Sequence, residues 1–125
     1  MDIKTISKEI NKNAVVHGFW KAKRSVVSEK LMLIVSELGE AMEADRKDYH
    51  TQPTAEIKKI LDWKSETIFE RMFKGYVKDT FEDELADSVI RIFDLAEHFG
   101  IDLESHILAK HRYNKSRPYM HGKKY

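Results

Sequence analysis

The sequence predicts an all-α protein, a bundle of four or five helices that forms a single domain over residues 1–125. Glycine and proline are scarce, with five and two copies in 125 residues, and both residue types interrupt helices. β-branched residues rarely alternate with polar ones, as they would in half-buried strands. Hydrophobic residues make up 42% of the chain, which is enough for a packed core.

The first helix is expected over residues 2–15. Gly18 interrupts it, and the stretch Lys21–Arg24 reads as a basic loop. The helix repeats apolar residues near one face, namely Ile3, Ile6, Ile10 and Val15.

The second helix is expected to begin at a serine cap, Ser25 or Ser28, and to run to about Lys47. A turn-like break follows over residues 48–53. The predicted core stripe of this helix consists of Leu31, Ile34, Val35, Leu38 and Met42.

A third helical segment is expected over residues 55–73, with Thr54 as its cap and Gly75 as its end. Trp63 lies off its apolar stripe. The stripe consists of Ile57, Ile60, Leu61, Ile68, Met72 and Phe73.

Two further helices complete the chain. Thr80 is expected to cap a helix over residues 81–99, and Gly100 to stop it. Asp102 is expected to start a last helix to about Lys115, beyond which Pro118 prevents much continuation. The inward residues of the helix over 81–99 are predicted to be Leu85, Val89, Ile92, Phe93, Ala96 and Phe99.

Composition excludes several classes of protein. The formal charge of +1 lacks the basic excess of a dedicated nucleic-acid binder, so no nucleic-acid partner is expected. The absence of cysteine excludes disulfides, thiolate metal sites and a cysteine nucleophile. Neither a signal-peptide pattern nor an apolar run of about 20 residues is present, so the chain is expected to be cytoplasmic, with no membrane partner.

Two pairs of carboxylates are the features of the sequence that indicate a metal site most clearly. Glu37 and Glu40 are three residues apart in one predicted helix, as are Glu84 and Asp87 in another, so each pair projects toward one side of its helix. Four gathered acids repel one another unless a cation lies between them. Hard oxygen ligands suit Mg²⁺, or alternatively Mn²⁺.

The two pairs differ in position on a helical wheel. Glu37 falls inside the apolar arc of its helix and Glu40 at its edge, whereas Glu84 borders its own stripe and Asp87 lies well round from it. An acid in a core-facing arc must be paired, protonated or metal-bound. The alternative is that these acids decorate a solvated face, as most acid pairs do in a chain with 21 acids.

Three runs resemble the MazG-type all-α nucleoside triphosphate pyrophosphohydrolases of the MazG-like, dimeric dUTPase-related superfamily. They are Glu29-Lys-Leu-Met-Leu-Ile-Val-Ser-Glu-Leu-Gly-Glu-Ala-Met-Glu-Ala44, Phe81-Glu-Asp-Glu-Leu-Ala-Asp-Ser-Val-Ile-Arg-Ile92 and Lys110-His-Arg-Tyr-Asn-Lys-Ser-Arg-Pro-Tyr-Met-His-Gly122. The family signature, Glu-x-x-Glu followed by Glu-x-x-Asp, maps onto the metal ligands Glu37, Glu40, Glu84 and Asp87.

The resemblance implies a Mg²⁺-dependent hydrolase that converts a nucleoside or deoxynucleoside triphosphate to the monophosphate and diphosphate. Glu37 or Glu40 would orient or deprotonate the attacking water. It also implies a homodimer or homotetramer and a task such as cleansing nucleotide pools. The 43 residues between Glu40 and Glu84 exceed the commonest family spacing, and the excess lies around residues 50–79.

Five further residues are candidates for substrate binding. Lys110, Asn114 and Arg117 are spaced i, i+4, i+7, so one helical face could offer two cations and an amide to phosphate; the alternative is an ordinary solvated basic C-terminus. Trp20 comes two residues after Gly18 in a loop-like context and could stack on a base, or equally anchor the first helix. His17 could contact a base edge.

Two other functions were weighed against this one. A di-iron bundle calls for Glu-x-x-His motifs, and no histidine here follows a glutamate at that spacing. The remaining alternative is a non-catalytic helical interaction or regulatory module whose acidic faces lie at the surface.

Overall fold

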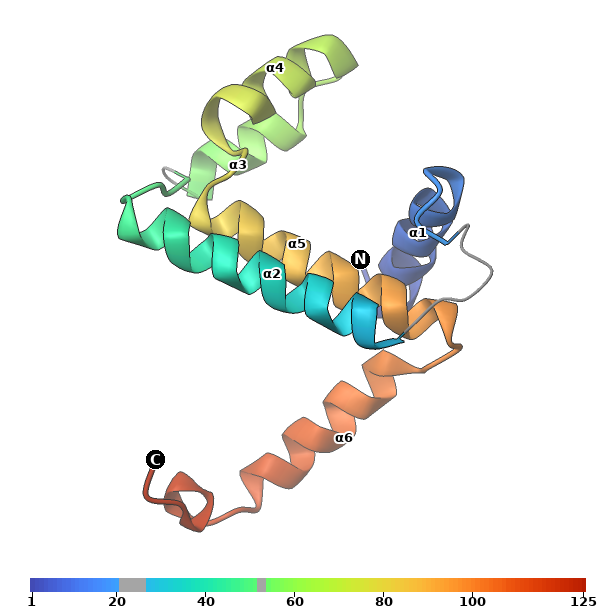
Figure 1. The fold of residues 1–125 in the computed structure, drawn as a ribbon, viewed down its shortest axis with the longest axis vertical. Helices are drawn as coiled ribbons and strands as arrows, with labels where there is room; N and C mark the ends of the chain where they lie inside the picture. Colours follow the sequence, from blue (N-terminus) through green and yellow to red (C-terminus); the bar gives the residue numbers. More distant parts are fainter. Residues whose placement is uncertain (21–26, 52–53) are drawn as a thin grey trace. The chain divides into compact units, whose positions relative to one another are not determined.

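The computed structural model describes residues 1–20, 27–51 and 54–125, and every regular element in these ranges is helical (Figure 1). The expectation of an all-α protein is therefore confirmed, with six α-helices in these described ranges where four or five were predicted for the chain. The elements are α1 (Ile3–Val16), α2 (Val27–Arg46), α3 (Thr54–Leu61), α4 (Glu66–Tyr76), α5 (Phe81–His98), α6 (Leu103–Lys115) and the short 3₁₀ helix η1 (Tyr119–Gly122).

The additional helix comes from the segment predicted as one helix over residues 55–73. It is divided into α3 and α4 by a break after Leu61, and Ser65 restarts the helix because its Oγ accepts a hydrogen bond from the backbone N–H of Ile68 at 3.4 Å. The expectation that Gly75 ends this segment is wrong. α4 passes through Gly75 to Tyr76, and Val77 forms its C-cap.

Most other predicted helix ends are confirmed. Thr80 Oγ1 accepts from the Asp83 N–H at 3.3 Å, and Asp102 Oδ1 accepts from the Ser105 N–H at 3.1 Å, as N-caps do. Gly18 and Gly100 follow α1 and α5 with φ of 86° and 65°, a conformation that favours glycine.

The start of α2 differs from the prediction. Ser28 lies within the helix, which begins at Val27, so Ser28 is not its cap. Ser25 and the expected basic loop Lys21–Arg24 lie outside the described residues, as does the side chain of Thr54.

The chain divides into two compact units, so each is described by itself. Unit 1 comprises residues 1–23 and 93–125, and unit 2 comprises residues 24–92. In unit 1, the Lys4 N–H of α1 donates to Glu104 of α6 at 3.2 Å, and the Asn11 amide donates to Asp94 Oδ1 at 2.8 Å. The prediction of a single domain stays a prediction.

In unit 2, α2 and the first part of α5 lie side by side and run in opposite directions (Figure 1). A backbone hydrogen bond of 2.9 Å from the Phe81 N–H to the Tyr49 carbonyl joins the end of α2 to the start of α5. The Thr51 N–H donates to the Glu82 carboxylate at 2.7 Å beside it.

The buried face of α2 differs from the predicted apolar stripe, but the prediction that Glu37 lies in a core-facing arc is confirmed, because Glu37 is 6% exposed. Of the predicted stripe only Ile34 is buried, and the other four residues are about half exposed. The buried positions follow a helical repeat through Ile34, Glu37, Ala41 and Ala44. The face of α2 that is buried within this chain is therefore the face that carries Glu37.

The predicted inward stripe of α5 is likewise mostly exposed, with Ala96 as its buried member and Leu85, Val89, Ile92 and Phe99 each at least 39% exposed. In the part of the chain that the structure describes, every helix falls short of the length and apolar content needed to cross a membrane.

Candidate metal centre

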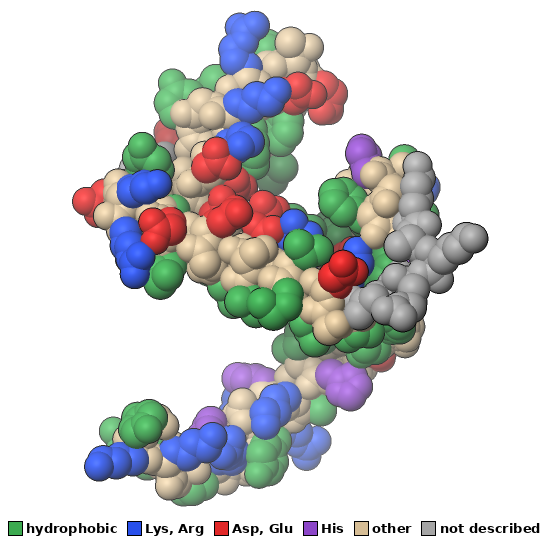
Figure 2. All heavy atoms as spheres, viewed as in Figure 1, with side chains coloured by type: hydrophobic (Ala, Val, Ile, Leu, Met, Phe, Trp, Pro, Cys, Tyr) green, Lys and Arg blue, Asp and Glu red, His purple; other side chains and the backbone are tan. Residues whose placement is uncertain are grey.

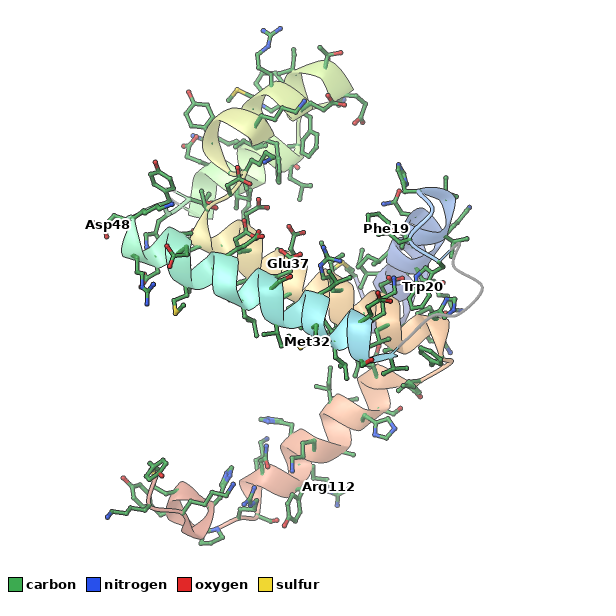
Figure 3. The ribbon with its side chains drawn as sticks, in the orientation of Figure 1. Phe19, Trp20, Met32, Glu37, Asp48 and Arg112 are labelled. Carbon is green, nitrogen blue, oxygen red and sulfur yellow. The ribbon has the colours of Figure 1, made fainter. Side chains whose placement is uncertain are left out.

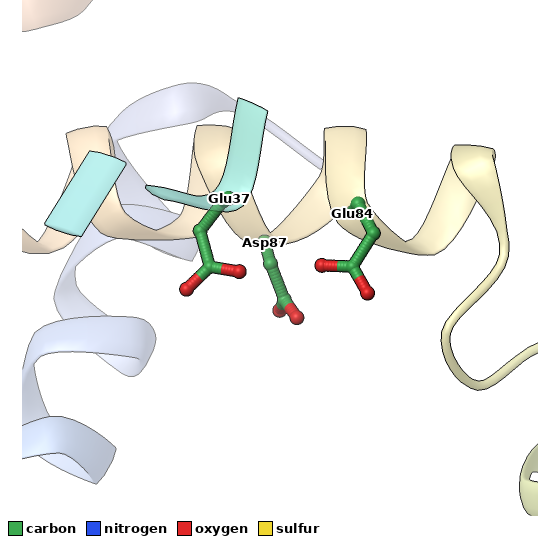
Figure 4. A group of neighbouring side chains, drawn as sticks. All are labelled: Glu37, Glu84 and Asp87. Atoms are coloured by element: carbon green, nitrogen blue, oxygen red, sulfur yellow. The ribbon is translucent and has the colours of Figure 1, made fainter. Parts of the chain in front are cut away.

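Three carboxylates meet between α2 and α5. One oxygen from each of Glu37, Glu84 and Asp87 lies within 4.8 Å of the others, and the three side chains turn toward one another (Figure 4). We call these residues the acid triad. Glu37 and Glu84 are buried, with 6% and 5% of their surface exposed, and Asp87 is more exposed. The structure thus brings together three of the four predicted metal ligands.

Local sequence explains the convergence. Glu84 and Asp87 are three residues apart, so they share one face of α5. Glu37 projects from the buried face of α2, where the neighbouring helical turn carries Ala41, which is 3% exposed. Because alanine is small, it leaves room for α5 to lie close to Glu37. Figure 2 shows further acidic side chains gathered over α2 and the start of α5.

Burial and, after it, the charges of neighbouring acids raise two pKa values in the triad. Burial, followed by the charges of Glu40 and Asp87 and a hydrogen bond with Glu37, raises the pKa of Glu84 from 4.5 to about 7. Burial also raises the pKa of Asp87, and the charges of Asp83 and Glu37 add to the effect. Glu84 and Asp87 therefore hold protons more tightly than free carboxyls, as buried acids do beside other negative charges.

Arg91 supplies positive charge beside the triad. Its Nε donates to Glu37 Oε1 at 2.5 Å, and its side chain is one-third exposed. Sequence reasoning missed this residue. Its position held a signal, because Arg91 follows Asp87 by four residues and Glu84 by seven, so all three lie on one face of α5.

A second acid group adjoins the triad and shares Glu84 with it. Oxygens of Asp79, Asp83 and Glu84 also lie within 4.8 Å of one another. Asp83 Oδ2 accepts from the Asp79 N–H at 2.9 Å, and Asp79 pairs with Lys78 at 2.8 Å. Asp83 was also missed, although it precedes Asp87 by four residues on the same helical face.

Glu40, the fourth predicted ligand, is exposed and belongs to neither group. Its charge is nevertheless the largest electrostatic contribution to the raised pKa of Glu84, so its carboxylate acts on the triad at short range. A role for Glu40 in binding metal stays a prediction.

The predicted phosphate-binding residues Lys110, Asn114 and Arg117 belong to unit 1. Lys110 and Asn114 are on α6, but the helix ends at Lys115, so Arg117 does not continue the same helical face. The side chains of Lys110 and Arg117 lie 5.1 and 5.6 Å from the centre of the Tyr113 ring. Their binding of phosphate stays a prediction.

Trp20 and His17 also belong to unit 1. Trp20 lies beside the second half of α5 (Figure 3). Its ring stacks on His98, with centroids 3.5 Å apart and planes 6° apart, and its Nε1 donates to both Asp94 oxygens at 3.0 Å. These contacts fix the tryptophan to α5, as the anchoring alternative expects. His17 is exposed at the end of α1, where its Nδ1 lies 2.8 Å from the Asn13 carbonyl oxygen. Base contacts by either residue stay predictions.

Searches of protein-family models, curated proteins and solved structures find no match to this chain. The structure itself defines an all-α protein with acidic groups that could hold a metal ion.

Proposed function

We propose that this chain is a metal-dependent nucleoside triphosphate pyrophosphohydrolase. It hydrolyses a nucleoside or deoxynucleoside triphosphate between the α and β phosphates and releases the monophosphate and diphosphate. The observation that carries the proposal is the acid triad, in which two buried glutamates from different helices and one aspartate converge. The motifs that predicted these ligands are the ones that resemble the pyrophosphohydrolase family.

The donors of the triad fit Mg²⁺ or Mn²⁺. All three are carboxylates, which are hard ligands, and no cysteine exists in the chain to favour a softer ion. Burial and, after it, the charges of neighbouring acids raise the pKa of Glu84 and of Asp87, which disfavours their ionised forms without a cation. A divalent cation would supply that charge and draw both carboxyls into their ionised form.

Each residue has a distinct task in the proposed reaction. Glu37, Glu84 and Asp87 hold the ion, which when bound neutralises phosphate charge and lowers the pKa of a coordinated water. Glu40, whose carboxylate is exposed and outside the triad, would accept the proton of the attacking water. Arg91, which faces Glu37 and is partly exposed, can turn its remaining guanidinium N–H groups to a phosphate oxygen.

A panel of standard and modified triphosphates tests the proposal. With Mg²⁺ or Mn²⁺, the wild type is expected to release pyrophosphate rather than orthophosphate. Glu37→Gln and Asp87→Asn are expected to lose this activity while they stay folded. Glu70→Gln is the matched control, because the Glu70 side chain is 65% exposed on α4 and its carboxylate lies 3.8 Å from the ammonium group of Lys74. A wild type that turns over no nucleotide in the panel overturns the enzymatic function and favours the non-catalytic module.

We also propose that α2 pairs with a second copy of the chain. Its outer face exposes Leu31, Met32, Val35, Leu38 and Met42, each about half exposed or more. These five residues form an apolar row, whereas apolar residues on most protein surfaces are scattered singly. Apolar rows of this kind mark interaction surfaces.

Met32→Glu tests this self-association, measured by light scattering. Met32 is 63% exposed and lies about 140° round α2 from Glu37, so the substitution should spare the acid triad. The variant is expected to be monomeric, whereas Leu61→Glu, at a position 73% exposed on α3, keeps the native mass. A monomeric wild type would refute the pairing.

A further inference from the structure

A pocket of about 460 Å³ lies in unit 2 beside the acid triad. Glu84 is common to both, and Glu40, which acts electrostatically on Glu84, also lines the pocket. The rest of the lining that matters here comes from the second half of α2 and the turn after it, namely Gly39, Glu43, Lys47 and Tyr49. Its volume is within the range of small-molecule sites, about 300–1,000 Å³.

The turn that carries Tyr49 is fixed by its backbone. Asp48 adopts a φ of 54°, which reverses the chain after α2. The Tyr49 N–H donates to the Ala44 carbonyl and its own carbonyl accepts from the Phe81 N–H, both at 2.9 Å. The Tyr49 side chain, in contrast, is 59% exposed. A rigid backbone thus presents a largely uncovered aromatic ring at the edge of the pocket.

Gly39 lines another part of the pocket. A Cβ atom added at Gly39 would meet no atom within 4 Å, so a side chain there would point into open space. A large side chain at this position would therefore occupy part of the pocket.

The charges of the lining select the part of a nucleotide that fits. Glu40, Glu43, Asp79 and Glu84 are the carboxylates of the lining and Lys47 is its cation, so a bare phosphate chain would be repelled here. Glu43 Oε1 already accepts from Arg46 Nη1 at 2.6 Å, which leaves Glu43 Oε2 as the acceptor for a ligand. A nucleoside is uncharged, and its sugar hydroxyls and base N–H groups are donors that carboxylates accept. Its flat base can stack on the Tyr49 ring.

We propose that this pocket is the nucleoside subsite, in which Tyr49 stacks on the base and Glu43 accepts hydrogen bonds from the nucleoside. The inference rests on the proposed function, because the triad beside the pocket would hold the phosphates through the metal ion. It assigns substrate recognition to the end of α2 and to Tyr49, which no motif in the sequence singled out.

The test uses Gly39→Leu and Tyr49→Ala, with Gly75→Leu and Tyr76→Ala as matched controls. Gly75 is also helical with no atom within 4 Å of an added Cβ, Tyr76 is 64% exposed, and neither lines the pocket. The measurements are steady-state kinetics with Mg²⁺ and the binding of AMP and of pyrophosphate by equilibrium dialysis. Circular dichroism and thermal melting check that each variant folds.

The pocket variants are expected to raise KM and the Kd of AMP about tenfold, the loss that one base stack represents, with kcat and pyrophosphate binding little changed. The controls should match the wild type. An active wild type whose pocket variants keep native KM and AMP binding overturns the subsite alone. A wild type that releases no pyrophosphate overturns the proposed function. The subsite is still supported in that case if the wild type binds AMP and only the pocket variants lose this binding.

Discussion

Replacing Glu84 by glutamine should make the metal-free protein more stable at neutral and alkaline pH. The pKa of Glu84 rises from 4.5 in an unstructured chain to about 7 in the fold, chiefly because the side chain is buried. The folded state therefore binds this proton more tightly than the unfolded state does. Ionisation of Glu84 carries no penalty below pH 4.5, an increasing penalty between pH 4.5 and 7, and its full penalty above pH 7.

The size of the penalty follows from the shift. Each pKa unit corresponds to about 1.4 kcal/mol, so the change from 4.5 to about 7 amounts to about 3 kcal/mol at pH 8. Glutamine keeps the shape of the side chain without the charge. Glu84→Gln should consequently recover much of this free energy at pH 8 and little of it at pH 4.5.

Urea unfolding in EDTA at a series of pH values from 4.5 to 8.5 measures the effect. The difference in unfolding free energy between variant and wild type should grow with pH and level off above pH 7. Glu70→Gln, at its exposed position, should stay within about 0.5 kcal/mol of the wild type throughout. A Glu84→Gln variant that is less stable than the wild type at pH 8 would refute the reasoning.

Three further outcomes can be measured. The wild type should bind Mn²⁺ about tenfold more tightly for each pH unit up to pH 7, and its affinity should then level off, because the ion displaces the proton of Glu84. Electron paramagnetic resonance measures this affinity, and an affinity that does not change with pH would contradict the prediction. Arg91→Gln should lower the unfolding free energy of the metal-free protein by about 2 kcal/mol, because Glu37 stays buried without its cation. The same substitution should tighten Mn²⁺ binding, and weaker Mn²⁺ binding would show instead that Arg91 assists the binding of the ion. Thr80→Ala should lower the melting temperature, with a loss of about 1 kcal/mol for the cap of α5, whereas Thr80→Ser keeps the hydroxyl and most of the stability.

The parts of the fold that could be predicted from sequence are those set by neighbouring residues. Thr80 and Asp102 cap helices through bonds to residues three positions away, and Gly100 ends one through its own backbone. The division between α3 and α4 was missed because continuous apolar spacing outweighed the capping signal of Ser65. Gly75 was expected to end the helix because glycine is a common stop signal, but glycine is also tolerated inside a helix, and α4 continues through it.

The candidate site was only partly predictable because it depends on which helix faces cover each other. The apolar stripe predicted for α2 wrongly included Val35 and Leu38 as core, whereas the prediction that Glu37 lies in a core-facing arc is confirmed. That geometry also creates the contact between Glu37 and Arg91, which are 54 residues apart and share no local pattern. Spacing within one helix found Glu84 and Asp87, but it could not show that Arg91 faces Glu37.

The hydrogen bond between Tyr49 and Phe81 has a consequence for how this chain tolerates change. The segment from His50 to Thr80, which contains α3 and α4, leaves and rejoins the α2–α5 pair at two points only 2.9 Å apart. Residues can be added to or removed from such an excursion without altering the separation of its ends, and lengthening it adds little loop-closure entropy. The number of residues between Glu40 and Glu84 along the sequence is therefore uncoupled from the distance between them in the fold. Helices α3 and α4 form an appendage whose length and composition can diverge while the acid triad keeps its geometry.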